Sequence, residues 1–142
     1  MDTITDAMKA YLKEIYLLEG ERRKVKTTDL AQRFSVAPAS VTEMVQKIAA
    51  IGLLIYEPYR GVRLTGEGRK LIVQILRRHR LTEKLLVDFV GMDIPSACEE
   101  ASKLELIVSD RFVNGICAAF NHPTICPCGK PISRGEGCCG GK

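Results

Sequence analysis

The sequence predicts a mainly α-helical fold: an N-terminal winged helix-turn-helix with a two-stranded wing, then a helical domain and a cysteine-rich tail. Three observations lead to this fold class. Apolar residues recur at helical spacing along most of the chain up to residue 120, two short β-like runs flank a turn at residues 57–61, and four of the six cysteines lie in the last 17 residues. We expect the corresponding domains to span residues 1–65, 66–122 and 123–142.

The first three predicted helices have clear start and stop signals. The first is capped by Thr5 or Asp6 and ends at Gly20, and the second is short and capped near Thr27. The third begins at Pro38, whose missing N–H costs nothing there, and ends at Gly52. The residues that we expect these helices to bury are Met8, Tyr11, Leu12, Ile15, Tyr16, Leu30, Ala31, Phe34, Val41, Met44, Val45 and Ile48.

The remaining elements follow the same logic. Two β-like runs at residues 53–56 and 62–65 predict a hairpin, and Thr65 can cap a long helix from Gly66 to about Gly91. Two further helices are expected at about 96–108 and 109–120, before a break at 121–123. Beyond it glycine and proline are frequent and large apolar residues are scarce, so we expect no core in the tail.

Composition narrows the function classes. Lys and Arg number 21 against 17 Asp and Glu, a formal net charge of +4 that fits a nucleic-acid partner but is shared by many proteins without one. No apolar run reaches the roughly 18 residues of a membrane span, and the acidic N-terminus is unlike a signal peptide. We therefore expect a cytoplasmic protein with no membrane partner, in which clustered cysteines favour metal or redox chemistry over disulfides.

The order helix, short helix, turn, helix and hairpin is typical of DNA-binding domains, whose third helix enters the major groove while the wing contacts the backbone. Ala39 can meet a thymine methyl, Gln46 can pair with adenine or a phosphate, and Glu43 either reads cytosine or narrows site choice. The alternative is a protein-binding domain with solvent-facing polar residues. The predicted DNA-contacting residues are Thr27, Pro38, Ala39, Ser40, Thr42, Glu43, Gln46, Lys47, Tyr59 and Arg60.

Metal-binding side chains share one face of the long helix. The apolar members of this face are Ile72, Leu76, Leu86 and Val90. His79 and Glu83, four residues apart on it, form either a divalent-metal site or a buried hydrogen bond. Cys98 and Glu105 lie on one face of the next helix and could complete the site as ligands. Mixed nitrogen, oxygen and sulfur donors suit Fe²⁺, Zn²⁺ or Co²⁺.

The tail carries a second candidate site, made of Cys126, Cys128, Cys138 and Cys139. Four thiolates suit tetrahedral Zn²⁺ or an iron–sulfur cluster. Adjacent cysteines seldom both bind one ion, so Cys98 is an alternative fourth ligand. A reversible disulfide switch and a tail without a site are the other interpretations. Cys117 is assigned to the core, and His122 is either a ligand or a turn residue.

From about Tyr11 to about Ile132 the chain resembles the metal-dependent repressors related to the diphtheria toxin repressor and the manganese transport regulator. The segments that carry the resemblance are 36–47, 54–61, 78–86, 99–101, 122–123 and 129–132. The resemblance implies a homodimer, assembled through the helices after the wing, that binds a palindromic operator and represses metal-uptake or storage genes. It also implies that the SH3-like domain of longer members is absent.

Such repressors have two adjacent metal positions. The resemblance implies that one of them uses His79, Glu83 and Cys98, where the family often has histidine at the last position. The other keeps only Glu105, because the positions aligned with its remaining ligands hold Ala10, Lys13, Ser102 and Leu106. The family's manganese or ferrous-iron response therefore does not carry over directly, and cysteine ligation is the expected replacement.

We predict a DNA-binding, metal-responsive repressor of iron or related metal homeostasis, not an enzyme. Its cofactor is Fe²⁺, Mn²⁺ or Zn²⁺, or an iron–sulfur cluster, and its partners are double-stranded DNA and a second copy of the chain. A thiol-redox-responsive regulator and a metal-binding adaptor that uses the winged helix for protein contacts are the alternatives. An enzyme is disfavoured because no nucleophile–base pair, phosphate loop or paired acid is present.

Overall fold

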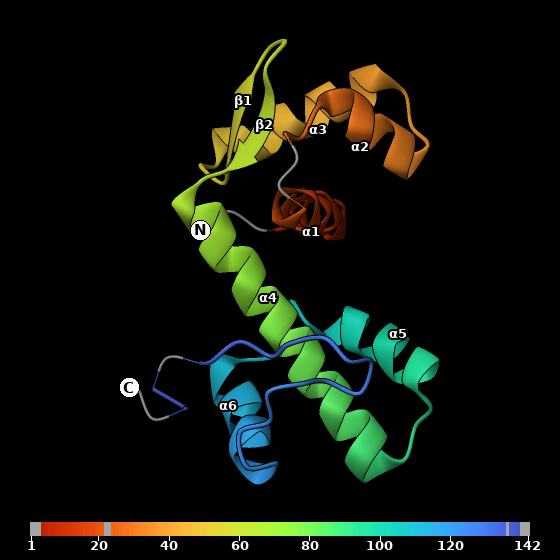
Figure 1. Ribbon diagram of the computed structural model, residues 1–142, viewed down its shortest axis with the longest axis vertical. Coiled ribbons are helices and arrows are strands. Elements are labelled where there is room, and N and C mark those ends of the chain that lie inside the picture. The colour runs from red at the N-terminus through yellow and green to blue at the C-terminus, as the bar shows by residue number, and fades with distance from the viewer. Residues whose placement is uncertain (1–3, 22–23, 136, 140–142) are drawn as a thin grey trace. The chain divides into compact units, whose positions relative to one another are not determined.

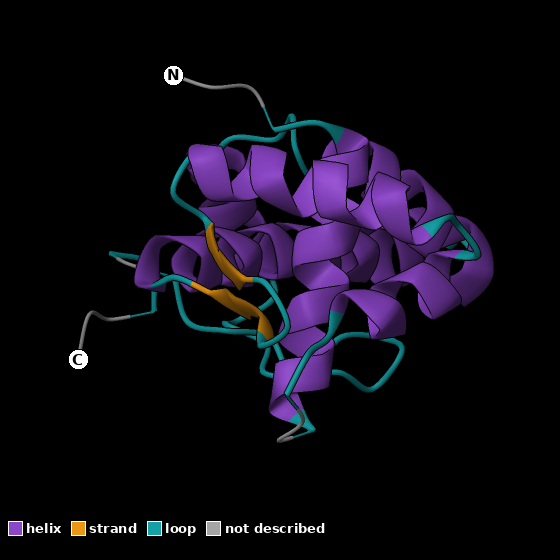
Figure 2. Cartoon of the chain, turned by 90° about the horizontal axis from the view of Figure 1, so that it is seen from above, coloured by secondary structure: helices purple, strands orange, loops and turns teal. Residues whose placement is uncertain are grey.

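A computed structural model describes residues 4–21, 24–135 and 137–139. The chain divides into two compact units, Met1–Ile72 and Val73–Lys142, with the division inside the long helix α4 (Figure 1). The elements in chain order are α1 (Asp6–Gly20), α2 (Thr27–Phe34), α3 (Pro38–Ala50), β1 (Leu54–Glu57), β2 (Gly61–Leu64), α4 (Gly66–Leu85), a π-helical turn (Leu86–Val90), α5 (Ile94–Leu104) and α6 (Asp110–Ala119). The mainly helical fold class and the winged helix-turn-helix are confirmed (Figure 2).

The core of the first unit forms where the three N-terminal helices meet. The Thr5 hydroxyl accepts a hydrogen bond from the Met8 N–H at 3.1 Å, which identifies Thr5 as the cap of α1. Leu12 and Ile15 are fully buried, as predicted. Tyr11 stacks on Phe34 of α2 with ring centroids 4.5 Å apart, so the partly exposed end of this core is covered by aromatic packing.

The turn between α2 and α3 sets the entry of the third helix. Ser35 adopts a left-handed conformation with φ 53°, and the following N–H, of Val36, donates to the Ala31 carbonyl at 3.1 Å. Pro38 then occupies the first turn of α3. Val41, Val45 and Ile48 are fully buried, which confirms the predicted inward face and leaves the opposite face of α3 to solvent.

The wing is a two-stranded antiparallel sheet in which Leu54 pairs with Leu64 and Glu57 with Gly61. Each strand lies one residue away from its predicted range. The pairing of Glu57 with Gly61 brings both strands one residue closer to the turn. Val25 adds a bridge to Val62, whose N–H donates to the Val25 carbonyl at 2.9 Å. A Cβ at Gly61 would lie 2.3 Å from that same carbonyl oxygen, so only glycine allows this approach.

The second unit begins within α4. Leu76, His79 and Glu83 of the predicted stripe are buried, but Val90 is 58% exposed. The helix widens into the π-helical turn at Leu86, which changes the number of residues per turn and rotates later positions off the stripe. Gly91, with φ 90°, ends the helix at the predicted residue.

The tail packs against the helices of the second unit. Cys126 and Ile132 join Val113, Ile116 and Leu81 in one buried cluster. Two arginines of α4 hold the tail's backbone: Arg77 Nε donates to the Ser133 carbonyl at 3.0 Å, and Arg80 Nη1 donates to the Pro131 carbonyl at 2.6 Å. The tail lacks a core of its own. Cys126, which behaves as a small apolar residue, instead becomes part of the core of the second unit.

Within the described residues, no helix combines the length and the apolar character needed to cross a membrane.

Candidate nucleic-acid interface and metal centre

The exposed face of α3 carries the predicted base-reading residues. Ala39, Ser40 and Gln46 are exposed, and the same face presents an ion pair between Lys47 and Glu43, whose Nζ and Oε1 atoms lie 3.4 Å apart. Thr42 is half-buried, and its hydroxyl donates to the Pro38 carbonyl at 3.2 Å. The Glu43 carboxylate, which repels phosphate, therefore has a neighbouring cation on its own helix.

The tip of the wing projects fully into solvent. Tyr59 is completely exposed with φ 67°, a left-handed conformation, and Arg60 beside it is also exposed. A cleft of about 400 Å³ lies between the wing and the start of α2, and both Tyr59 and the predicted contact residue Thr27 line it. The structure thus brings Thr27 and Tyr59 to one surface, where both can reach a sugar-phosphate backbone.

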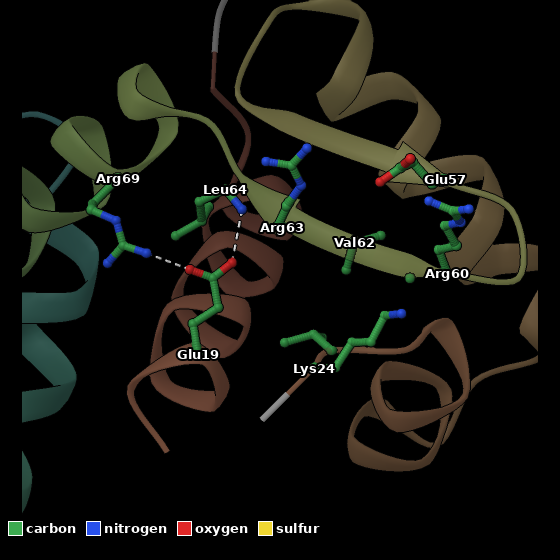
Figure 3. Close-up of a pocket in the computed structure, with 10 residues that line it drawn as sticks. Glu19, Lys24, Glu57, Arg60, Val62, Arg63, Leu64 and Arg69 are labelled. Carbon is green, nitrogen blue, oxygen red and sulfur yellow. Dashed lines mark hydrogen bonds and ion pairs between the residues drawn. The ribbon is translucent and has the colours of Figure 1, made fainter. Parts of the chain in front are cut away.

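A second cleft of about 470 Å³ on the wing contains basic residues that the sequence analysis missed (Figure 3). Lys24 and Arg63 line it together with Arg60. Glu19 also lines this cleft. Its carboxylate accepts hydrogen bonds from the Leu64 N–H at 2.8 Å and from Arg69 Nη2 at 2.5 Å. Strand alternation could have found Arg63, since it lies between the buried residues Val62 and Leu64.

The predicted metal-binding residues of α4 and α5 meet in the second unit. One donor atom each from His79, Glu83 and Cys98 lies within 4.8 Å of the others. His79 is 6% exposed and Glu83 is fully buried, whereas Cys98 is exposed and gives solvent a route to the group. The His79 Nε2 atom lies 3.5 Å from Cys98 Sγ and 3.9 Å from Glu83 Oε2.

Glu105 contacts the opposite side of the imidazole. The Nδ1 atom of His79 lies 2.6 Å from Glu105 Oε2, and since an ionised carboxylate only accepts, Nδ1–H is the donor. This bond leaves Nε2, which faces Glu83 and Cys98, as the nitrogen available to a metal. Glu105, predicted as a ligand, contacts the ring from the Nδ1 side and is not in the group whose donor atoms lie within 4.8 Å of one another in the described part of the chain.

Two tail cysteines complete the surroundings of Glu83. Glu83, Cys126 and Cys128 also have donor atoms within 4.8 Å of one another. The Cys126 and Cys128 sulfurs are 2.8 Å apart. Burial, the Cys126 thiol and the negative charge of Glu83 together raise the pKa of Cys128 to about 11. We call these five residues, His79, Glu83, Cys98, Cys126 and Cys128, the Glu83 centre.

The other two tail cysteines lie elsewhere. Cys138 and Cys139 cluster with Cys117 and His122, with one donor atom of each residue within 4.8 Å of the others. We call these four residues the tail-end cluster. The tail cysteines thus belong to two groups instead of one, and Cys98 belongs to the Glu83 centre. Cys117, assigned to the core alone, is buried there but also turns its thiol toward His122 Nδ1 at 3.3 Å.

Electrostatics differ within the tail-end cluster. Burial raises the pKa of Cys117 to about 12, with further contributions from the Cys139 and Cys138 side chains. The pKa of Cys139 is lowered to about 6, mainly by a backbone hydrogen bond from Gly135 and then by the Cys117, His122 and Cys138 side chains. Cys139 is therefore the thiol of this group that most readily becomes a thiolate.

Comparison with known proteins matches both units. Residues 3–62 match the iron dependent repressor N-terminal DNA binding domain, and residues 65–134 match the iron dependent repressor metal binding and dimerisation domain. The chain is 42% identical over 125 residues to the HTH-type transcriptional regulator MntR of Lysinibacillus sphaericus, covering 85% of this chain and 89% of that protein. It is 33% identical over 132 residues to the diphtheria toxin repressor of Corynebacterium efficiens, covering 93% of this chain and 57% of the relative.

Solved structures agree with these matches. The structure of ScaR with bound Zn²⁺ is similar with a TM-score of 0.76 and 38% identity, covering 89% of this chain and 59% of that one. A manganese-dependent transcriptional repressor in complex with manganese is similar with a TM-score of 0.77 and 35% identity, and the match covers 91% of this chain and 59% of that one. The chain thus spans little more than half the length of several relatives. With both domains of the family present in order, the chain belongs to the iron dependent repressor family, whose members are transcriptional regulators and not enzymes.

Proposed function

We propose that this chain is a metal-dependent, DNA-binding transcriptional repressor whose signal is a divalent ion held at the Glu83 centre. The observation that carries the proposal is the state of the Glu83 carboxylate. It is fully buried, and within the described part of the chain neither of its oxygens accepts a hydrogen bond of standard geometry, although the Cys128 thiol and the His79 ring lie nearby. A buried carboxylate without a cation beside it costs several kcal/mol. A cation bound by Glu83 together with His79 and Cys98 would remove this penalty.

The donor set favours some metals over others. Imidazole, carboxylate and up to three thiolates suit Fe²⁺ or Zn²⁺ better than Mn²⁺, which prefers oxygen donors. An iron–sulfur cluster commonly takes four cysteine ligands. The cysteines near Glu83 are three, Cys98, Cys126 and Cys128, and the tail-end cluster supplies three with one histidine. We therefore place a mononuclear Fe²⁺ or Zn²⁺ ahead of an iron–sulfur cluster.

Within this centre we assign distinct roles. His79 and Glu83 supply the nitrogen and oxygen ligands from adjacent turns of α4, and Cys98 supplies a thiolate from α5. Glu105 fixes the ring orientation of His79 through the 2.6 Å bond to Nδ1. Cys126 and Cys128 form a second group of donors that shares only Glu83 with the first, and an ion bound by Glu83 and either thiol would tie the tail to α4.

DNA binding is assigned to α3 and the wing. The exposed residues of α3 are proposed to read base edges in the major groove, while Tyr59, Arg60 and Arg63 contact the backbone. Homodimerisation is assigned to the second unit, where large apolar side chains, among them Phe89 and Ile107, are exposed. A two-fold dimer fits a palindromic operator, and a cytoplasmic location is proposed because a regulator must reach the DNA that it binds.

The test measures metal content and DNA affinity together. The full chain first selects its operator from a random DNA pool, and fluorescence anisotropy then gives the affinity with Fe²⁺, Zn²⁺ or Mn²⁺ under anaerobic conditions. We expect Glu83→Gln to lose one metal ion per chain and the metal-dependent part of DNA affinity. The control is Glu99→Gln, an exposed carboxylate of α5 that pairs with Lys103. Unchanged metal content and affinity in Glu83→Gln would overturn the proposal.

A second candidate function has one supporting observation. The Cys126 and Cys128 sulfurs, 2.8 Å apart, lie between the roughly 2.05 Å of a disulfide and the roughly 3.8 Å that two thiolates adopt on one tetrahedral zinc ion. Hydrogen peroxide could take two electrons from the two thiols, forming one S–S bond and two waters. Loss of DNA affinity after peroxide treatment, restored by a dithiol and absent in Cys128→Ser, would favour this redox function.

A further inference from the structure

The tail-end cluster has a composition and geometry that the Glu83 centre does not explain. Cys117 lies near the end of α6, His122 in the turn that follows, and Cys138 and Cys139 in the last described residues. The Cys117 Sγ atom is 3.6 Å from Cys139 Sγ and 3.3 Å from His122 Nδ1, and Cys138 Sγ is 3.9 Å from the same nitrogen. Three sulfurs and one nitrogen thus surround one point.

These distances match a tetrahedral metal site. With zinc–sulfur bonds of about 2.3 Å and a zinc–nitrogen bond of about 2.0 Å, ideal tetrahedral angles place two sulfurs about 3.8 Å apart and a sulfur and nitrogen about 3.5 Å apart. The observed separations of 3.6, 3.3 and 3.9 Å lie within a few tenths of an ångström of these values. Small adjustments would therefore bring all four donors onto one ion.

The local backbone explains how neighbouring cysteines can serve the same ion. The N–H groups of Cys138 and Cys139 both donate to the Gly135 carbonyl, at 3.1 and 3.4 Å, in a tight turn that contains Gly137 with φ 71°. Cys138 Sγ also lies 3.6 Å from the Asn114 carbonyl of α6. The turn thus keeps both thiols on the side of the tail that contacts α6, which removes the objection that adjacent cysteines seldom share an ion.

We propose that Cys117, His122, Cys138 and Cys139 bind one zinc ion in a closed structural site, separate from the Glu83 centre. Three cysteines and one histidine make up a common ligand set of structural zinc sites and leave no open coordination position. The ion joins α6 to residues 138–139 and closes a loop of chain that includes Cys126 and Cys128. Its role is to hold the tail in place, so it does not depend on the function proposed for the Glu83 centre.

The experiment counts zinc ions in the intact chain. Protein stripped with a chelator under anaerobic, reducing conditions is loaded with Zn²⁺ alone, desalted and measured by mass spectrometry for zinc per chain. We expect two ions in the wild type, one in His122→Ala and one in Glu83→Gln. His122 is exposed, so its replacement leaves the core intact, and circular dichroism checks this. In a Glu83→Gln background, which we expect to hold the tail-end ion alone, His122→Ala should take the count from one to zero. The matched thiol control Cys98→Ser should leave it at one in the same background.

Cobalt provides an independent readout. Co²⁺ bound by three thiolates gives intense tetrahedral bands and sulfur-to-metal charge transfer, which we expect to weaken in Cys139→Ser but to survive in Glu83→Gln. An unchanged zinc count and cobalt spectrum in both His122→Ala and Cys139→Ser would overturn the proposal. So would a Cys117–Cys139 disulfide that persists in reduced, zinc-loaded protein. If Glu83→Gln alone kept both ions, the proposed function would fail while the tail-end site stood.

Discussion

Glu105 offers a sharp test of how the Glu83 centre is built. Glu105 is 2% exposed, and its carboxylate accepts the Nδ1–H of His79, which is also buried, at 2.6 Å. Replacing it with alanine removes the acceptor that fixes the imidazole, while the three nearest candidate ligands remain. Loss of such an orienting group lowers metal affinity about 10- to 100-fold, or about 1.4 to 2.8 kcal/mol.

The two replacements of Glu105 should differ. Glu105→Gln keeps the side-chain length and an acceptor oxygen but loses the charge, so we expect the affinity for metal to fall about tenfold. Glu105→Ala also leaves the buried Nδ1–H of His79 without an acceptor, so we expect the affinity for metal to fall about 100-fold, the upper end of that range. Competition with a chelating dye for Zn²⁺ measures both, in a His122→Ala background that leaves the tail-end cluster out of the titration.

The order of affinities decides the interpretation. If Glu105 orients His79, the order is wild type, then Glu105→Gln, then Glu105→Ala. If Glu105 is itself a ligand, as the sequence analysis expected, glutamine should weaken binding as strongly as alanine. Equal affinity in all three proteins would refute both roles. Glu100→Ala, which removes a carboxylate of α5 paired with Lys103 at 2.8 Å, is the control and should bind like the wild type.

Three further predictions concern the DNA-binding unit. Arg63→Ala should lower DNA affinity for all sequences and reduce the slope of log affinity against log salt by about 1, measured by anisotropy; an unchanged slope would remove Arg63 from the interface. Gly68→Ala should reduce the free energy of unfolding, measured by urea titration, by about 1–3 kcal/mol, because its Cβ would meet the Leu53 carbonyl oxygen. The control Gly66→Ala, with open space around its Cβ, should be neutral or stabilising in the same urea titration. Leu12→Ala should cost about 2–5 kcal/mol, since Leu12 is fully buried, and a loss below 1 kcal/mol would contradict the assigned core.

Much of the first unit was predictable because its signals are local. Capping by Thr5, the start of α3 at Pro38 and its buried face depend on residues within one or two helical turns of each other. The wing strands were found but displaced by one residue, because Glu57 and Gly61 pair next to the turn and an alternation of apolar residues does not mark that pair. Val90 was wrongly placed on the apolar stripe because nothing in the helical period foretells the π-helical turn.

The candidate metal residues were predictable as types but not as groups. Helical spacing alone put His79 and Glu83 on one face and Cys98 and Glu105 on another. It could not tell that Glu105 binds Nδ1 of His79, since that contact depends on how α5 packs against α4. Lys24 was overlooked for a similar reason, because the cleft that it lines exists only once the wing has folded, whereas strand alternation could have indicated Arg63.

The sequence by itself determined the winged helix-turn-helix, the helix faces and the presence of metal-binding side chains, because each is encoded by short-range periodicity. Only the tertiary structure decided how the tail cysteines divide. Cys126 and Cys128 reach Glu83 while Cys138 and Cys139 reach His122. A tail rich in glycine and proline has no period from which its path can be read. That path is set by packing on α6 and by hydrogen bonds from α4, which are contacts across many residues of chain.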